Sequence, residues 1–264
     1  MKDCLLGSNV LSLFDGMSCG RIALEKAGIN IDKYYASEID KYSIKVGNAN
    51  YPDIIKLGDV TGLTWTGPAN DLIIGGSPCQ GFSFAGKHLN FEDPRSRLFF
   101  EFVRLMDKTK PKWFLLENVR MKEESKDIIS RYLGVQPVMI NSSLVSAQNR
   151  KRLYWTNIPF TMPEDRGILL KDIIEDGLVD RGKAHCLDAN YFKGGNLKSY
   201  FEKSRRQLVF SNKDYLEWRK LTPLECERLQ TVPEGYTAHV SNTQRYKMLG
   251  NGWTVDVIAH IFKN

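Results

Sequence analysis

The segment Gly75-Gly76-Ser77-Pro78-Cys79 places a thiol on a loop directly after a short apolar run, residues 72–74. The glycines let a substrate approach the main chain, and Pro78 restrains the backbone beside the cysteine. A cysteine held in this way is a candidate nucleophile, whereas most free cysteines are buried structural thiols. Because the loop is rich in Gly, Pro and Ser, its composition favours an accessible thiol.

Two further groups have chemistry that complements a nucleophile. Glu117 follows the apolar run 113–116, where a carboxyl group can hold or protonate a ring nitrogen. Arg150 and Arg152 are two residues apart, so they share one face of an extended segment. A fixed guanidinium group holds a carbonyl oxygen or a phosphate through paired hydrogen bonds. The alternatives are a surface or helix-capping acid and a basic strand edge.

Polar residues also follow the first strands that the sequence predicts. Gly16 and Gly20 permit a tight turn close to a ligand, but they do not form a Gly-x-Gly-x-x-Gly fingerprint. Glu38 ends the second expected strand, where a carboxylate accepts both hydroxyl groups of a ribose. Asp59 would end the third and accept from an adenine amino group. Three such features indicate a nucleoside cofactor without a phosphate cradle, and S-adenosylmethionine fits that description.

These groups meet only if a sheet brings several strand ends to one edge. Short apolar runs alternate with amphipathic segments over the first 160 residues, which predicts an α/β fold with a mostly parallel sheet and helices on both faces. Strands are expected at 10–14, 34–37, 72–74, 113–116, 138–140 and 153–156, and helices near 21–27, 41–50, 98–106 and 254–262. Another helix should start at Thr222-Pro223, since Thr caps helices and Pro fits the first helical position.

Composition limits the class of protein. The 264 residues are 42% hydrophobic and 26% charged, which suits one large soluble domain or one domain with a small lobe. The chain has no run of about 18 apolar residues and no long apolar block at its start, so we expect no membrane span, no signal peptide and a cytoplasmic location. The five cysteines form no Cys-x-x-Cys pair, so we expect free thiols and no metal site.

The regular pattern weakens after about residue 161. Residues 181–206 carry seven Lys or Arg against two acids, within a net charge of +6 for the chain. Such a surplus fits contact with phosphates, or a solvated loop without a partner. We expect residues 161–220 to form a linker and a short, irregular lobe, and residues 1–160 and 221–264 to form the main domain.

The order of the motifs resembles the DNA (cytosine-5) methyltransferase family. The resemblance rests on Phe14-Asp15-Gly16, Pro78-Cys79-Gln80, Glu117-Asn118-Val119, the Gln-x-Arg-x-Arg pattern at 148–152, Leu221-Thr222-Pro223 with Glu225 and Arg228-Leu229-Gln230, and Leu249-Gly250-Asn251-Gly252-Trp253. Ala36-Ser37-Glu38, Arg97 to Phe102 and Gly252-Trp253 are most similar to the catalytic domain of animal de novo enzymes, although a lone catalytic domain is typical of a bacterium or a phage. Ser18 replaces a glycine common in bacterial members, and the short lobe leaves the target sequence open.

The resemblance implies a Rossmann-like, S-adenosylmethionine-dependent methyltransferase fold and methylation of cytosine in double-stranded DNA. Cys79 would attack carbon 6 of a base flipped out of the duplex. Glu117 would hold or protonate ring nitrogen 3, and Arg152 would fix the 2-carbonyl oxygen. Arg150 would lie nearby and favour the thiolate. Loss of the carbon 5 proton would then release Cys79.

The family pattern also assigns the remaining site residues. The implied cofactor residues are Phe14, Asp15, Gly16, Ser18, Cys19, Gly20, Glu38, Ile39, Asp59, Val60, Gly76, Pro78, Asn251 and Trp253. The residues expected to contact DNA are Gln80, Ser83, Lys183, Lys193, Lys198, Arg205 and Arg206. A homodimer through the region Phe99 to Phe102 is a further expectation.

Three other functions stay open. A transfer-RNA cytosine methyltransferase shares this fold but typically carries a Cys-Phe-Thr tripeptide, which this chain lacks. A DNA-binding or regulatory subunit usually loses the nucleophile or the cofactor motif, and both are present here. A thiol-transfer enzyme that uses Cys79 would need a resolving cysteine nearby in the sequence, and none is there.

Overall fold

The computed structural model describes residues 7–78 and 97–263, so Cys79, Gln80 and Ser83 lie outside the described residues. The strands are β1 (Ser8–Leu13), β2 (Ile31–Ser37), β3 (Ile55–Gly58), β4 (Leu72–Gly75), β5 (Trp113–Val119), β6 (Val138–Asn141), β7 (Lys151–Thr156), β8 (Leu208–Phe210) and β9 (Trp218–Lys220). The α-helices are α1 (Cys19–Ala27), α2 (Lys41–Asn50), α3 (Arg97–Thr109), α4 (Glu123–Leu133), α5 (Leu197–Lys203), α6 (Pro223–Leu229), α7 (Asn242–Asn251) and α8 (Val255–Lys263). None of the described helices is long and apolar enough to cross a membrane.

The large sheet has seven strands in the order β3-β2-β1-β4-β5-β7-β6. Strands β1 to β5 pair in parallel, and only β7 runs antiparallel to its neighbours β5 and β6. The chain runs outward from β1 to β3 and then returns to place β4 on the other side of β1. In an open sheet, a reversal of this kind opens a crevice at the carboxyl ends of the strands. The mostly parallel α/β sheet expected from the sequence is confirmed.

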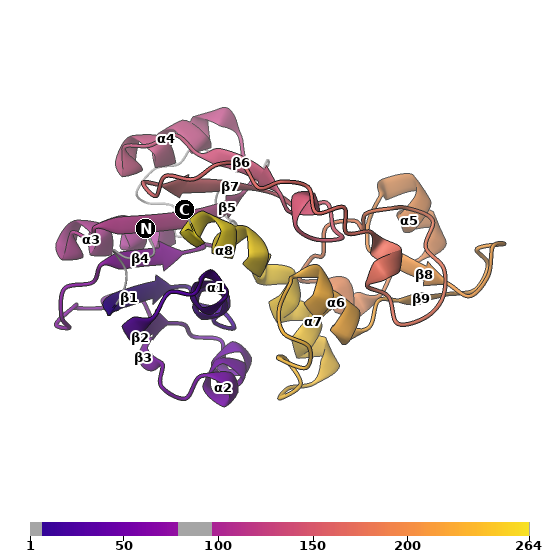
Figure 1. The fold of residues 1–264 in the computed structure, drawn as a ribbon, viewed down its shortest axis with the longest axis horizontal. Helices are drawn as coiled ribbons and strands as arrows, with labels where there is room; N and C mark the ends of the chain where they lie inside the picture. The colour runs from indigo at the N-terminus through magenta and orange to yellow at the C-terminus, as the bar shows by residue number, and fades with distance from the viewer. Residues whose placement is uncertain (1–6, 79–96, 264) are drawn as a thin grey trace.

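Helices cover both faces of this sheet (Figure 1). Alternate residues of the strands face opposite sides, so Val10 and Ile74 pack into one core, which includes residues of α1 and α8. Leu11 and Ile73 pack into the other core, which includes residues of α3 and α4. Helices α1 and α8 pack against each other, so the last helix of the chain contacts the first.

The observed bounds show which helices and strands could be predicted from local sequence patterns. Helix α2 coincides with the expected 41–50, and α6 begins at Pro223 with Thr222 as its cap, whose side chain accepts from the Glu225 N–H. Strand β5 extends three residues beyond its apolar run, so Glu117 lies inside the strand, paired with Tyr154 of β7, and not after it. Helix α4 was not expected, because its charged first turn, Glu123-Glu124, hides a short apolar stripe.

The smaller lobe lies at one end of the molecule, away from the large sheet (Figure 1). Its small core consists of Tyr200, Leu208 and Phe210, from α5 and β8. Strand β8 pairs antiparallel with β9. The lobe thus contains regular elements that the sequence analysis treated as irregular, because each has seven residues or fewer and leaves no clear period.

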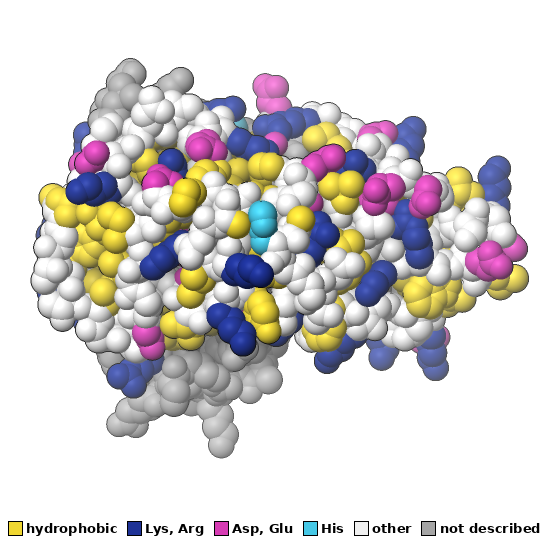
Figure 2. Space-filling view, turned by 90° about the horizontal axis from the view of Figure 1, so that it is seen from below, with side chains coloured by type: hydrophobic (Ala, Val, Ile, Leu, Met, Phe, Trp, Pro, Cys, Tyr) yellow, Lys and Arg dark blue, Asp and Glu magenta, His cyan; other side chains and the backbone are white. Residues whose placement is uncertain are grey.

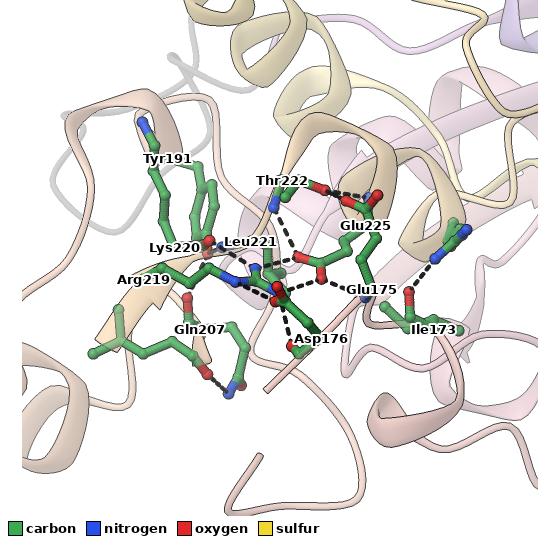
Figure 3. Close-up of polar contacts among 12 residues, drawn as sticks. Ile173, Glu175, Asp176, Tyr191, Gln207, Arg219, Lys220, Leu221, Thr222 and Glu225 are labelled. Carbon is green, nitrogen blue, oxygen red and sulfur yellow. Dashed lines mark hydrogen bonds and ion pairs between the residues drawn. The ribbon is translucent and has the colours of Figure 1, made fainter. Parts of the chain in front are cut away.

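A buried carboxylate ties this lobe to helix α6 (Figure 3). Glu225 of α6 is fully buried, and both of its oxygens accept from the Arg219 guanidinium of β9, at 2.8 and 2.9 Å. The same carboxylate accepts from the main-chain N–H groups of Glu175 and Thr222. Arg219 also bonds the exposed Asp176, and hydrogen bonding to Glu225 is the largest cause of its raised pKa. One charge pair therefore joins the strand β9, helix α6 and the segment before the lobe.

Comparing the loss of Arg219 with the loss of its exposed partner Asp176 should separate the buried interaction with Glu225 from the exposed one. We expect Arg219→Ala to lower the free energy of unfolding by about 2–3 kcal/mol, because it leaves the Glu225 carboxylate buried without its cation. The loss is smaller than for a fully buried ion pair, because water reaches the half-exposed arginine. The matched control, Asp176→Ala, removes a partner that is 79% exposed and should cost less than about 1 kcal/mol. Urea unfolding of both variants measures the difference. Equal stability of the two variants would show that the buried pair does not anchor the lobe.

Candidate active site

A cavity of about 580 Å³ lies at the carboxyl ends of the strands, next to the reversal between β1 and β4. Its opposite wall comes from residues 186–189, before the small lobe's core, and from the end of α7 and the turn that follows it. Twelve of the expected cofactor residues line it: Phe14, Asp15, Gly16, Cys19, Glu38, Ile39, Asp59, Val60, Gly76, Pro78, Asn251 and Trp253. The expected catalytic residues Glu117, Arg150 and Arg152 line the same cavity.

The turn after β1 is shaped by a buried carboxylate. Asp15 accepts hydrogen bonds from the hydroxyl groups of Ser12, Ser18 and Tyr34, at 2.6 to 2.8 Å. Burial raises the pKa of Asp15, and the three hydroxyl donors offset part of that rise. Phe14 has a positive φ of 57°, a conformation that a non-glycine residue adopts only where its surroundings require it. The network around Asp15 supplies that constraint.

Ser18 and Gly20, expected as cofactor residues, do not line the cavity. The Ser18 side chain is fully buried against Asp15, while a Cβ at residue 20 would lie 2.3 Å from Cδ1 of Ile74 and 2.7 Å from the Tyr34 hydroxyl. A glycine is therefore needed where α1 crosses the sheet. Both residues therefore support the turn after β1 from the side that faces away from the cavity.

The ends of β2 and β3 present two carboxylates to the cavity. Glu38 accepts from the N–H groups of Gly16, Ile39 and Asp40, at 2.7 to 2.8 Å, so it fixes the turn after β1 as well as its own loop. Ile39 is 72% exposed, which is unusual for a large apolar side chain and leaves a hydrophobic surface on the cavity wall. Asp59 accepts from the Thr61 N–H, and that bond lowers its pKa.

Glu117 is bonded at both carboxylate oxygens. The Arg152 Nε lies 3.0 Å from one oxygen, and the indole N–H of Trp253 donates to the other at 3.1 Å. Burial is the largest single influence on Arg152 and lowers its pKa, but the Glu117 carboxylate, together with Cys186 and Tyr154, offsets burial, so the pKa of the guanidinium group is raised. Both Glu117 and Arg152 border the cavity, so an acid and a fixed cation stand side by side at one wall.

Arg150 uses its hydrogen bonds on the main chain. Its guanidinium nitrogens donate to the carbonyl oxygens of Leu187, Gly250 and Gly252 at 2.8, 3.2 and 2.8 Å. The side chain is 3% exposed, and burial, followed by the neighbouring Arg152, lowers its pKa. A Cβ at Gly250 would lie 2.2 Å from the main chain of Asp188, so these two segments touch directly. Arg150 thus links residues 187 and 250–252, on the wall opposite the strand ends, to the wall that carries Glu117 and Arg152. Its sequence pattern did not predict this structural role.

The described thiols differ in accessibility. Cys19 lines the cavity but is buried, and burial raises the pKa of its thiol to about 12. Cys226 is buried in the core, with a raised pKa for the same reason. Cys186 lines the cavity and accepts from Arg150 at 3.4 Å and from Arg152 at 3.9 Å. Sequence reasoning missed Cys186, since an isolated cysteine in a basic segment carries no spacing signal.

Among the basic residues expected to contact DNA, some are exposed and others bond main-chain carbonyl groups. Lys193, Lys198 and Arg205 are exposed on the lobe, while the Arg206 guanidinium donates to the Gly194 carbonyl. The Lys183 ammonium donates to three main-chain carbonyls, of Ser143, Ser146 and Ile168, and so holds three segments together. On the face seen in Figure 2, Lys and Arg side chains occur over both the broad part of the molecule and the narrow lobe.

Two further expectations concern metals and self-association. No group of three or more potential metal-binding side chains occurs among residues 7–78 and 97–263. Phe99 and Phe102 of α3 are fully buried in the core formed with α4, so their side chains serve packing within the chain. A homodimer through the region Phe99 to Phe102 stays a prediction.

The chain is similar in sequence to known DNA methyltransferases. The family model for C-5 cytosine-specific DNA methylase matches residues 8–159 and 139–264. Type II methyltransferase M1.ScrFI from Lactococcus lactis subsp. cremoris is 31% identical over 96% of this chain and 76% of its own length. Type II methyltransferase M.HhaI from Haemophilus parahaemolyticus is 27% identical over 98% of this chain and 94% of its own length. These similarities span both the sheet and the small lobe.

Solved structures share the fold at lower identity. A putative DNA modification methyltransferase encoded within a prophage of E. coli has a TM-score of 0.70 and 21% identity, covering 97% of each chain. A DNMT2 mutant from Spodoptera frugiperda has a TM-score of 0.73 and 20% identity, covering 97% of this chain and 100% of its own. With the family match over almost the whole length, the chain belongs to the C-5 cytosine-specific DNA methylase family and is a DNA (cytosine-5) methyltransferase.

Proposed function

We propose that this enzyme transfers a methyl group from S-adenosylmethionine to carbon 5 of a cytosine flipped out of double-stranded DNA, through a covalent adduct of Cys79. The observation that carries the proposal is one cavity in which Glu117 and Arg152 form a pair, while Pro78, the residue before Cys79, lines the same space. The acid and the cation expected around the base therefore border the same cavity as Pro78, which precedes Cys79 in the sequence.

The cavity fits an S-adenosyl cofactor. Its volume of about 580 Å³ lies within the range of small-molecule sites. Glu38 and Asp59 offer carboxylates for ribose hydroxyl groups and an amino group, and the exposed Ile39 offers an apolar surface for a flat ring. When bound, S-adenosylmethionine supplies an electrophilic methyl group. Asn251, Gly76 and the turn at residues 14–16 complete the cofactor site.

The chain's own residues make the pyrimidine reactive. The Cys79 thiolate attacks carbon 6, which turns carbon 5 into a nucleophile. Arg152 holds the 2-carbonyl oxygen, where negative charge develops, and Glu117 holds or protonates ring nitrogen 3. Arg150 lies nearby, held on the Leu187 and Gly252 carbonyl oxygens, where its charge would favour the Cys79 thiolate. Carbon 5 then takes the methyl group that the bound cofactor supplies, and S-adenosylhomocysteine is left. When carbon 5 loses its proton to solvent, the electron pair of that bond reforms the double bond between carbons 5 and 6 and expels the Cys79 thiolate, so the enzyme is regenerated.

DNA contacts come from the region that we assign to residues 161–220. The exposed Lys193, Lys198 and Arg205 would contact phosphates, which orient the duplex without reading its sequence. Gln80 and Ser83 follow the nucleophile and would meet the flipped nucleotide. The similarity to type II methyltransferases supports a role in restriction-modification.

Cys79→Ala should abolish methylation and leave DNA binding within about threefold of wild type, because the thiol forms the adduct but does not hold the duplex. Bisulfite sequencing of DNA from expressing cells measures methylation and also reveals the target sequence. The control is Cys186→Ser, which alters a different thiol, one that lines the cavity, and should keep its methylation. Methylation by Cys79→Ala, or loss of it only in Cys186→Ser, would assign the nucleophile to a different residue. Transfer of labelled methyl groups to transfer RNA but not to DNA would contradict the proposed substrate.

Glu38→Ala should weaken S-adenosylmethionine binding about 10- to 100-fold, the usual effect of losing charge-assisted hydrogen bonds, and change DNA affinity by less than about threefold. Isothermal titration calorimetry measures both affinities. Asp32→Ala, which removes an exposed acid of β2, the strand that Glu38 follows, is the control and should change neither. Unchanged cofactor affinity in Glu38→Ala would remove this residue from the cofactor site.

A further inference from the structure

The indole N–H of Trp253 joins two parts of the cavity that are far apart in the sequence. Trp253 lies in the turn between α7 and α8, 136 residues from Glu117 in β5, and its Nε1 lies 3.1 Å from one carboxylate oxygen. The other oxygen is occupied by Arg152. Trp253 is therefore one of the two side chains that fix where the Glu117 carboxyl group points.

The space for this bond depends on Gly76. A Cβ at residue 76 would lie 2.9 Å from the indole nitrogen and 3.2 Å from the Glu117 oxygen, closer than ordinary van der Waals contact. Gly76 also follows β4 and begins the segment that leads to Pro78. The tryptophan and the glutamate thus meet across the main chain that precedes the loop of the nucleophile.

The main chain around Trp253 is fixed from several sides. The carbonyl oxygen of Gly252 accepts from Arg150 at 2.8 Å and from Gln230 at 3.2 Å. A Cβ at Gly252 would lie 3.0 Å from Met17 and 3.4 Å from the Cys19 sulfur, so the turn after α7 rests on the turn after β1. These contacts fix the direction in which the indole side chain of Trp253 leaves the turn. A bond built on so many fixed contacts needs little reorganisation when substrates bind.

We propose that Trp253 is a positioning residue for Glu117: its N–H holds the carboxyl group where the target base needs it, in addition to any contact of its ring with the cofactor. This inference rests on the proposed function, in which Glu117 contacts the base. The rival view is that Trp253 is only an apolar wall of the cofactor site. The two views differ in what the N–H does, because phenylalanine keeps an aromatic wall but cannot donate.

Trp253→Phe tests the difference directly. We expect kcat for methyl transfer to fall about 10- to 100-fold, the effect of losing one hydrogen bond to a charged group. The affinity for S-adenosylmethionine and the KM for DNA should stay within about threefold. Trp65→Phe is the matched control, since it removes an indole N–H that bonds the Pro68 carbonyl on the surface, and it should leave kcat unchanged. Steady-state kinetics and calorimetry on the purified full chain provide these values.

A kcat within twofold of wild type would overturn the proposal, and so would a fall in kcat matched by an equal loss of cofactor affinity. Should Trp253→Phe fail to fold, Gly76→Ala approaches the same bond from the other side, because its methyl group separates the indole from the carboxylate. Because Gly76 also lies in the proposed cofactor site, kcat is measured at saturating S-adenosylmethionine, where Gly76→Ala should show the same loss, and an unchanged kcat would again overturn the proposal. Failure of the proposed function would be distinct, since wild type itself would then transfer no methyl groups to DNA.

Discussion

The active site depends on one topological constraint, the reversal of strand order between β1 and β4. Because β1 to β5 are parallel, the loops that follow them emerge at one edge of the sheet, and the reversal separates them enough to leave a cavity. The turn at residues 14–16, Glu38, Asp59 and the segment at 76–78 come together for this reason alone. Each lies after a different strand, and no helix or loop has to bend far to bring it there.

A second feature is that the cavity is closed by segments from the far end of the chain. Arg150 bonds the main chain of Leu187 and Gly252, and Trp253 bonds Glu117, so the segment before the small lobe's core, the turn after α7 and strand β5 share hydrogen bonds. The pair of Arg219 and Glu225 holds the lobe itself. A substrate that binds at one wall therefore meets a site whose other walls are already set, which is how a preorganised site reduces the cost of charge development.

The sequence predicted the fold class and most strand ends, because period, glycine turns and polar residues at strand ends are local signals. It could not place Arg150 on main-chain carbonyls or pair Trp253 with Glu117, since both contacts join segments about a hundred residues apart or more. Ser18 and Gly20 were expected at the cofactor but do not line the cavity, because position along a turn does not say which side chains face outward. Glu117 stood at the expected edge but within β5, since pairing with β7 extends the strand.

The central claim is a covalent bond between Cys79 and carbon 6 of the target cytosine. A duplex that carries 5-fluorocytosine tests it most directly, because fluorine cannot leave carbon 5 as a proton does, and the adduct then cannot break down. With S-adenosylmethionine present, we expect the protein and one DNA strand to stay joined under denaturing conditions, with the added mass on the peptide that contains Cys79. Methylation of the normal duplex without any trapped complex, or a trapped complex attached through another residue, would contradict it.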